Sequence, residues 1–526
     1  MGAKPHELSC LVLALCCLSV SADVFLSIDC GSSVSYRDDN LIDWSGDDNF
    51  TRTGESRSVP SASWLPRAAA TLRVFTSRAK NCYHIDSFKR GRALVRAGFY
   101  YGNYDGRSSP PTFELQFDGN RWATVETLAS ELVYHEVVYV MKGESISVCL
   151  AQTRPGQFPF LSSLEFRSLE PFMYAMVNET QPLFLRRRVA FGSNATIRYP
   201  NDLYDRIWSP EESSEAMIPV SSTAVFNGPI ILSELPPPAV LKHAVTAVSP
   251  TSSLQINMGF PIVEVPVYIN AYFSEVSRLQ LNETRSMSIF KDNQPFSQPF
   301  SPPYANCTQL YTNNITASTN TTFSIVPAND STLPPLINAI EVFVVGPDLT
   351  NGTDRRDVQG LEALQNVFGT LADWSGDPCL PAPYAWDWID CSSDSTPRVT
   401  ALLLSSFGLS EMLPNFSSMD ALRTIDFHNN SLQGPIPDFL GTLPNLRTLN
   451  LANNRLNGSI PASLSNRNGL DLVVTGNTEL CASGELCPAS SGNERLGSDV
   501  STENINNLPT LIFGIVIYYL MVYLLE

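Results

Sequence analysis

The feature that most constrains the fold of this chain is a repeat of 24 residues near its C-terminal end. Eight positions recur at that offset, and all but an asparagine and a glycine are apolar. They are Leu422, Ile425, Phe427, Asn430, Leu432, Gly434, Ile436 and Pro437, followed by Leu446, Leu449, Leu451, Asn454, Leu456, Gly458, Ile460 and Pro461. One unit cannot bury its leucines alone, but stacked units bury them together, and the asparagine can bond backbone groups left unpaired at the turn. The repeat therefore predicts a short solenoid over residues 398–487.

Ahead of the repeat, residues 23–346 show short alternating apolar runs broken by Gly, Pro, Asn and Asp. Alternation with period two between turn residues is typical of antiparallel strands in β-sandwiches. Three runs recur in order at offsets of 174 to 176: Ala97-Gly98-Phe99 with Ala271-Tyr272-Phe273, Phe113-Glu114-Leu115 with Met287-Ser288-Ile289, and Ser163-Leu164-Glu165 with Ala339-Ile340-Glu341. We therefore predict a mainly β chain with two tandem sandwiches, over about residues 23–170 and 180–346.

Residues 350–397 connect the two regions. Apolar residues spaced by three or four from Val358 to Leu371 predict a short helix that must dock on a neighbour. Tryptophan-rich segments around Cys379 and Cys391 follow the helix. A loop closed by these two cysteines is suited to cap the first turn of a solenoid.

The charge balance and the N-terminus bear on location and partners. The chain has 34 Lys and Arg against 52 Asp and Glu, a net charge of -18, whereas nucleic-acid affinity rests on cations that neutralise phosphate. Residues 1–22 combine a weakly basic start, an apolar stretch and small residues, which is the layout of a cleaved secretory signal peptide. We expect an exported chain that does not bind nucleic acid.

Residues 508–526 form a hydrophobic tail after a polar spacer at residues 488–507. A spanning helix of this length is physically possible, but a stop-transfer segment normally has Lys or Arg on its cytoplasmic side. A hydrophobic tail behind a polar spacer is the pattern of a glycolipid-anchor signal. The sequence favours a GPI anchor at the outer face of the plasma membrane or in the cell wall over a single span, with a soluble product third.

Eight cysteines remain once the three in residues 1–22 are set aside. An even number in an oxidising compartment is compatible with full pairing. Cys379 with Cys391 and Cys481 with Cys487 are close local pairs, and the latter resembles a C-terminal disulfide cap. Cys30, Cys82, Cys149 and Cys307 allow three connectivities. No Cys spacing typical of zinc occurs, so we expect no metal site.

Twelve Asn-x-Ser/Thr sequons predict an N-glycosylated surface. They lie at Asn49, Asn178, Asn194, Asn282, Asn306, Asn314, Asn320, Asn329, Asn351, Asn415, Asn429 and Asn457. Because glycans keep their carriers at the surface, we expect the cluster from Asn306 to Asn329 to be an exposed loop region.

Several segments resemble a known family, the plant malectin-like extracellular domain. They are Phe25-Leu26-Ser27-Ile28-Asp29-Cys30-Gly31, Asn81-Cys82-Tyr83, Tyr101-Gly102-Asn103-Tyr104-Asp105-Gly106 and Pro335-Leu336-Ile337-Asn338-Ala339-Ile340-Glu341, with Tyr199 to Trp208 similar to the opening of its second lobe. Trp374 to Cys379 resembles the Gly-Asp-Pro-Cys segment that joins malectin-like and leucine-rich parts in plant receptor kinases, and the Gly-x-Ile-Pro repeats resemble plant leucine-rich repeats. The resemblance implies the ectodomain of such a receptor without its kinase.

No motif for catalysis or for a cofactor emerges from the sequence. The four histidines outside residues 1–22 lie in no nucleophile, zinc-protease or phosphate-loop pattern. We therefore expect a non-enzymatic cell-surface recognition protein, a receptor-like or co-receptor component. Its expected partners are a wall-derived glycan, a peptide or a membrane receptor kinase.

Two sets of residues are candidates for ligand binding. Tyr101, Tyr104 and Asp105 could hold a glucose-containing oligosaccharide, the lectin alternative, because tyrosines stack on sugar faces and carboxylates accept hydroxyl hydrogen bonds. The plainer alternative for this segment is strand-end packing and a turn. Asp426, His428 and Asn450 occupy outward positions of the repeats, on the concave face where solenoids usually bind partners.

Overall fold

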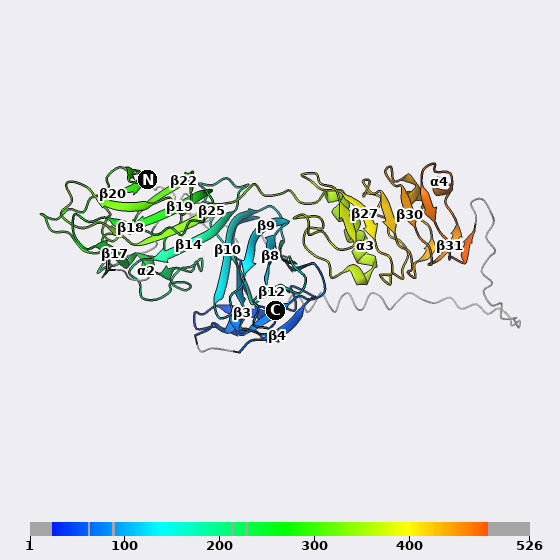
Figure 1. The fold of residues 1–526 in the computed structure, drawn as a ribbon, viewed down its shortest axis with the longest axis horizontal. Helices are drawn as coiled ribbons and strands as arrows, with labels where there is room; N and C mark the ends of the chain where they lie inside the picture. The colour runs from blue at the N-terminus through cyan, green and yellow to red at the C-terminus, as the bar shows by residue number, and fades with distance from the viewer. Residues whose placement is uncertain are drawn as a thin grey trace, which may run out of the picture.

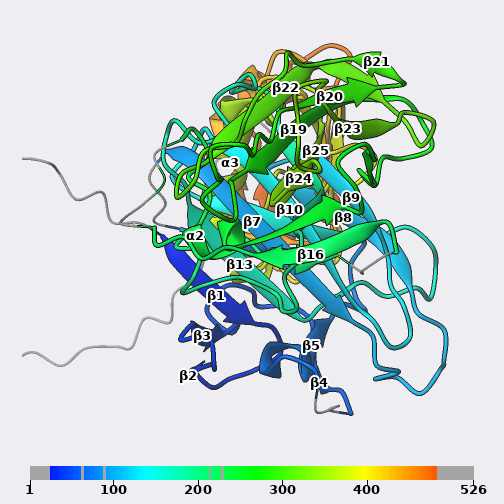
Figure 2. The same cartoon turned by 90° about the vertical axis from the view of Figure 1, so that its left-hand side faces the viewer.

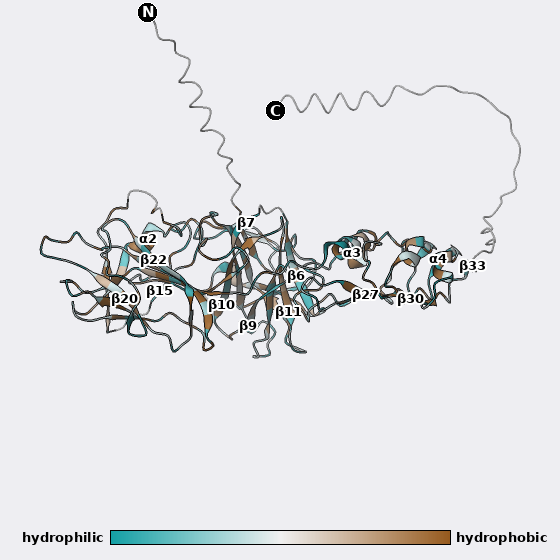
Figure 3. Ribbon diagram, turned by 90° about the horizontal axis from the view of Figure 1, so that it is seen from above, coloured by the Kyte–Doolittle hydropathy of each residue, from teal (hydrophilic) through white to brown (hydrophobic). Residues whose placement is uncertain are grey.

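The computed structural model describes residues 24–60, 64–86, 90–211, 215–226, 230 and 232–481. They form two β lobes and a solenoid, which lie in one row (Figures 1 and 3). The predicted fold class, with two tandem sandwiches followed by leucine-rich repeats, is confirmed. Among the described residues no helix has the length and apolarity needed to cross a bilayer. The expected signal peptide, Cys487, the spacer and the tail lie outside the described residues.

The first lobe spans residues 24 to 168. Its elements are β1 Phe25–Asp29, β2 Tyr36–Arg37, β3 Asp43–Gly46, β4 Glu55–Ser58, η1 Arg67–Ala69, β5 Thr71–Val74, β6 Lys80–Ile85, β7 Gly91–Tyr100, β8 Thr112–Phe117, β9 Asn120–Glu126, β10 Leu132–Met141, β11 Ile146–Gln152, β12 Phe160–Leu161 and β13 Ser163–Ser168. The core fills the space between the large sheet and the sheets β6-β11-β8-β9 and β12-β5-β4.

The second lobe repeats the arrangement. Its elements are β14 Leu183–Ala190, β15 Ser209–Pro210, β16 Met217–Ser221, α2 Pro238–Leu241, β17 His243–Ala247, β18 Leu254–Ile256, β19 Val265–Phe273, β20 Met287–Lys291, β21 Gln294–Pro295, β22 Thr308–Ala317, β23 Phe323–Pro327, β24 Leu336–Ile337 and β25 Ala339–Val345. Strand register confirms the internal repeat, because Leu164 pairs with Ala97 in one lobe and the corresponding Ile340 pairs with Ala271 in the other.

The two lobes share one sheet of 11 strands, which the sequence did not predict. Its main path runs β2-β3-β1-β13-β7-β10-β14-β25-β19-β22, and β10 of the first lobe pairs with β14 of the second at Val137–Phe184 and Val138–Leu183. Figure 2 shows the strands following one another from β1 near the bottom to β22 near the top. A continuous backbone ladder couples the lobes more tightly than side-chain contacts alone.

Buried charges reinforce this junction between the lobes. Arg96 on β7 contacts Glu136 at 2.9 Å and donates to the backbone carbonyl of Asp205 at 2.7 Å, and Arg188 on β14 contacts Glu136 at 2.8 Å and Glu341 at 2.7 Å. Burial opposes ionisation of Asp205, but nearby arginines outweigh it and hold the pKa of that carboxyl below its usual range. Charged groups buried this deeply are tolerated only in such pairs.

The solenoid and its N-terminal cap complete the described chain. The elements are α3 Arg355–Val367, η2 Gly369–Leu371, β26 Ile389–Cys391, β27 Val399–Leu403, β28 Thr424–Asp426, β29 Gln433–Pro435, η3 Asp438–Thr442, β30 Thr448–Asn450, β31 Arg455–Ser459, α4 Ala462–Ser465, β32 Asp471–Val473 and β33 Glu479–Cys481. The predicted helix is confirmed as α3, which begins at the N-cap Asp354 and ends where Phe368 turns extended.

The asparagines of the repeats have the predicted role. Asn454 donates to the carbonyls of Phe427 at 2.9 Å and Leu451 at 3.1 Å and accepts from the amide of Leu432 at 3.0 Å. Asn430 and Asn477 make the equivalent bonds one unit away on either side.

The four cysteines of the lobes form one disulfide. Cys82 pairs with Cys149, which is part of one of the three connectivities, but full pairing does not occur, because Cys30 and Cys307 are free and buried. They belong to different lobes: Cys30 follows β1 and Cys307 precedes β22, toward opposite ends of the large sheet. Burial raises the pKa of both thiols, that of Cys307 to about 12, which keeps them protonated and unreactive.

The cluster of sequons from Asn306 to Asn329 is not a loop. It contains β22 at the edge of the large sheet and β23, whose Phe323 and Ile325 lie in the core of the second lobe. Sequons mark the surface, but an edge strand is itself largely at the surface, so they did not distinguish the two.

Candidate functional site

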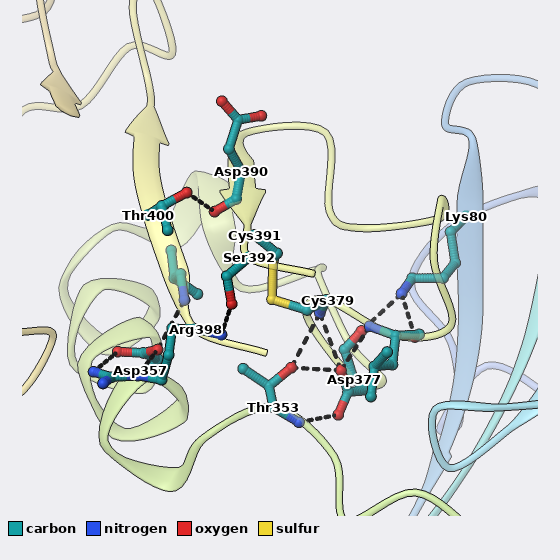
Figure 4. The surroundings of a disulfide bond; sticks show 12 residues. Lys80, Thr353, Asp357, Asp377, Cys379, Asp390, Cys391, Ser392, Arg398 and Thr400 are labelled. Atoms are coloured by element: carbon teal, nitrogen blue, oxygen red, sulfur yellow. Dashed lines mark hydrogen bonds and ion pairs between the residues drawn. A yellow bond between two sulfur atoms is a disulfide. The ribbon is translucent and has the colours of Figure 1, made fainter. Parts of the chain in front are cut away.

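The first lobe and the cap of the solenoid meet at a polar junction. Lys80 on β6 donates through Nζ to the carbonyls of Asp377 at 2.7 Å and Leu380 at 3.1 Å (Figure 4). Arg78 donates to the carbonyl of Asp373 at 3.0 Å, and Arg121 on β9 donates to that of Ala382 at 2.8 Å. Burial lowers the pKa of Lys80 to about 8. The cap therefore docks by its backbone onto cations of the first lobe.

The Gly-Asp-Pro-Cys segment supplies the closest contact of this junction. A Cβ on Gly376 would lie 2.6 Å from each sulfur of the Cys82–Cys149 disulfide, and its φ is +76°. Only glycine combines this backbone with so close an approach. The carboxylate of Asp377 then accepts from Thr353 Oγ1 at 2.6 Å and from the amide of Leu380 at 2.8 Å.

The predicted disulfide between Cys379 and Cys391 is present and closes the loop next to this junction (Figure 4). On its other side Arg398 donates to the buried carboxylate of Asp357 on α3 at 2.8 Å. Cys481 is also disulfide-bonded, and its expected partner Cys487 lies outside the described residues.

A cleft of about 1010 Å³ opens between the first lobe and α3. Residues 48–52 and the loop of residues 142–145 contribute to one wall, and Val358, Leu361 and Gln365 contribute to the other. The side chains of Asp48 and Asp86 are 67% and 77% exposed, and Glu362 is exposed on α3. The cleft thus has walls from two domains, and its three exposed carboxylates face two exposed cations, Arg52 and Lys142.

The cleft offers little aromatic surface. Trp374 and Trp386 belong to its lining but are only 8% and 5% exposed. The face of Trp374 is already covered by the Arg78 guanidinium, 4.3 Å from the ring centre. Stacking on a sugar ring needs an open aromatic face, which these two side chains do not provide.

The aromatic segment predicted as a ligand site folds on itself. Tyr101 is fully buried, its hydroxyl donates to Asp105 at 2.5 Å, and it accepts from the amide of Ser109 at 3.2 Å. Tyr104 is half-buried against Tyr101 and Phe160. The structure brings the three predicted residues together, and the ring of Tyr101 belongs to the core, so it offers no open face to a sugar.

The three candidates on the repeats are neighbours. Asp426 and Asn450 end β28 and β30 side by side in register, and His428 Nδ1 lies 2.6 Å from Asp426 Oδ1. All three side chains are partly exposed on the face opposite the leucines. The exposed Asn429 adjoins them and accepts from Asn453 at 2.9 Å.

Other predicted features can also be placed. Eleven of the twelve sequon asparagines are exposed and Asn457 is half-buried. Within the described ranges no group of three or more His, Cys, Asp or Glu side chains is arranged to hold a metal ion. Sequence reasoning missed Arg78, Lys80 and Arg121, since each lies 261 to 297 residues from its partner and no local pattern marks it.

Comparisons with known proteins agree with this architecture. The malectin-like domain model matches residues 28–345, and the leucine-rich repeat model matches residues 421–443 and 445–467. The probable LRR receptor-like serine/threonine-protein kinase At1g05700 of Arabidopsis thaliana is 35% identical over 432 residues, which cover 79% of this chain and 49% of the relative. The uncharacterized protein At1g24485 of the same plant is 34% identical, over 64% of this chain and 68% of that protein.

Solved structures show the same fold at low identity. The extracellular domain of ANXUR1 from Arabidopsis thaliana superposes with a TM-score of 0.52 at 17% identity, covering 62% of this chain and 99% of that one. The chain spans about half the length of the receptor-like kinases it matches. The malectin-like match covers more than half of the chain, and on that ground the protein belongs to the malectin-like domain family, with leucine-rich repeats of the kind found in LRR receptor-like kinases.

Proposed function

We propose that the protein is a non-enzymatic, receptor-like recognition ectodomain that binds its extracellular ligand in the cleft between the first lobe and α3. One observation carries the proposal: the cleft of about 1010 Å³ has walls from two domains that are locked together beside it by Lys80, Arg78 and Gly376. Pockets at domain junctions are preferred sites for ligands. A rigid junction also reduces the entropy that a ligand loses by ordering its site.

The ligand chemistry follows from the lining. Asp48, Asp86 and Glu362 are exposed in the cleft, and the tryptophans are covered. Carboxylates attract a cationic partner and speed its encounter. Two sequon asparagines, Asn49 and Asn351, also line the cleft, so glycans there would narrow it and favour a slender, extended segment over a branched ligand. We therefore propose a basic peptide segment in preference to a wall glycan.

The test is a calorimetric titration of the secreted, glycosylated chain with an oligo-arginine peptide, and with oligo-glutamate as the charge-reversed control. We expect binding of the cationic peptide only, weakening as salt rises because the attraction is between exposed charges. Glu362→Gln should reduce affinity several-fold, whereas Glu131→Gln, an exposed carboxylate of the first lobe outside the cleft, should leave it unchanged. Equal effects of the two variants would contradict the proposed site.

The lectin alternative depends on Tyr104 and Asp105, which remain partly accessible although Tyr101 is buried. A titration with glucose-containing oligosaccharides distinguishes it. Binding that is lost in Tyr104→Ala and retained in Glu362→Gln would favour the lectin over the peptide receptor.

We also propose a cellular location and a signalling partner for the protein. The protein would act outside the cell, held at the membrane by a GPI anchor attached near residues 488–507, and a membrane receptor kinase would be its signalling partner. The concave residues Asp426, His428 and Asn450 are the proposed contact for that partner. Release of the protein from plant membranes by a phosphatidylinositol-specific phospholipase tests the anchor, and retention of the protein in the membrane would refute it.

A further inference from the structure

The edges of the sheets in the two lobes are protected in different ways. An open edge presents unpaired N–H and C=O groups that can pair with another chain, and short length, charge, proline or a cover prevents this. Most edge strands in the described residues have one of these protections. Four are short: β2, β12 and β24 have two residues each, and β18 has three. The others carry charge, proline or a cover: Glu55 and Arg57 on β4, Arg121 and Glu126 on β9, Pro219 on β16, Pro295 on β21, and the contact of Lys80 on β6 with the cap.

The last strand of the large sheet has neither short length nor charge nor proline, although its register is irregular opposite Tyr268. β22 has ten residues, Thr308–Ala317, with no charged residue and no proline. It pairs with β19 on one side, and no described strand pairs with its other side. Threonine, tyrosine and isoleucine give it a high strand propensity. Apart from that irregularity, nothing in the sequence of this edge opposes pairing with a second strand.

The strand carries a glycosylation sequon at its centre. Asn314, in the sequon Asn314-Ile315-Thr316, is exposed and lies at the irregularity where Asn313 and Asn314 together oppose Tyr268. Asn313 is tied down by a bond to the carbonyl of Met176 at 2.5 Å, whereas Asn314 is exposed. Asn306 and Asn320, two further exposed sequon asparagines, lie just before and just after the strand.

We propose that N-linked glycans on β22, above all at Asn314, cover the open edge of the shared sheet and keep two copies of this chain from joining edge to edge. A branched oligosaccharide is hydrated and bulky, so it excludes an approaching strand as a lysine does on other edges. The occupant that it excludes is a second copy, because β22 paired with itself gives a closed, two-fold contact with no like charges opposed.

The experiment compares two variants that both remove the glycan. Asn314→Gln leaves an uncharged edge, and Asn314→Lys puts a charge in the same place. Each is secreted from a glycosylating host, alone and together with Asn306→Gln and Asn320→Gln, and Asn415→Gln in the solenoid controls for loss of one glycan elsewhere. Mass spectrometry of the wild-type glycopeptides establishes occupancy, and sedimentation velocity measures self-association.

We expect the Gln series to dimerise at least about tenfold more tightly than wild type. Hydrogen exchange should then show new protection in residues 308–317. The Lys series and Asn415→Gln should stay monomeric like wild type. An unmodified Asn314 in the secreted wild type, a monomeric Gln series, or association of the Lys variants as strong as that of the Gln variants would each overturn the proposal.

Discussion

At the scale of single residues, Gly376 tests the docking of the solenoid on the first lobe. Gly376→Ala would put a Cβ 2.6 Å from two sulfurs at a φ of +76°, so we expect local loosening that costs about 2–4 kcal/mol. Faster hydrogen exchange in residues 372–380 would measure it. Gly369→Ala is the matched control, because nothing lies within 4 Å of its added Cβ. Equal exchange in the two variants would contradict the tight junction.

His135 gives the molecule a sensitivity to acid. Burial and the nearby Arg186 lower its pKa from 6.5 to about 4, and its Nε2 has no hydrogen-bond partner. The unfolded chain then binds a proton at a higher pH than the folded chain, so stability is full above pH 6.5 and is lost as pH falls toward 4. For this half-buried side chain the loss is about 1–3 kcal/mol.

His135→Gln should remove that part of the acid sensitivity. The measurement is the urea midpoint at pH 7 and at pH 4.5, with the difference between the two compared in variant and wild type. An unchanged difference would show that His135 is protonated in the folded protein as readily as in the unfolded one.

At the scale of elements, the repeats are the part that sequence predicts best. Each unit is local, so the period, the inward leucines and the role of Asn430 and Asn454 can all be inferred from one stretch of chain. Strand pairing between distant segments has no such local signal. The pairing of β10 with β14 and the choice of Cys149 for Cys82 therefore emerged only in the structure.

Asn454→Ala tests the asparagine side chain through which each repeat bonds the backbone of neighbouring turns. The change leaves the buried amide of Leu432 without its partner and removes one of two side-chain donors from the carbonyls of Phe427 and Leu451, which should lower the free energy of unfolding by about 1–3 kcal/mol. Thermal unfolding followed by circular dichroism measures the loss. Asn466→Ala, an exposed asparagine at the end of α4, should stay within about 0.5 kcal/mol of wild type. A similar loss of stability in both variants would mean that the side-chain hydrogen bonds of Asn454 do not stabilise the repeats.

The candidate site shows the same division between local and distant signals. The Tyr101 segment was recognisable because its residues are adjacent, but burial decided its role, and burial depends on distant Phe160. The cleft was not recognisable at all, because its walls come from segments that lie far apart in the sequence. The Gly-Asp-Pro-Cys segment is the exception. It is a local motif, and its Gly376 also makes a long-range contact with the Cys82–Cys149 disulfide.

At the scale of the whole molecule, the shared sheet predicts that the two lobes unfold together. Arg188→Met would remove the ion-pair partner that Glu136 and Glu341 share inside the lobe junction. Breaking a buried ion pair in this way lowers the free energy of unfolding by about 3–5 kcal/mol. Calorimetry should show one transition for both lobes, shifted to lower temperature in the variant. Arg186→Met, an exposed change on the same strand, should not shift it. Separate transitions for the lobes in the wild type would contradict the coupling.

The central claim is that the first lobe and the solenoid cap together form one ligand site. Hydrogen exchange of the secreted chain with and without an oligo-arginine peptide tests it most directly, because one experiment reports on both walls. We expect residues 48–52 of the lobe and residues 358–366 of α3 to gain protection together. Protection confined to one wall, or found only outside the cleft, would contradict it.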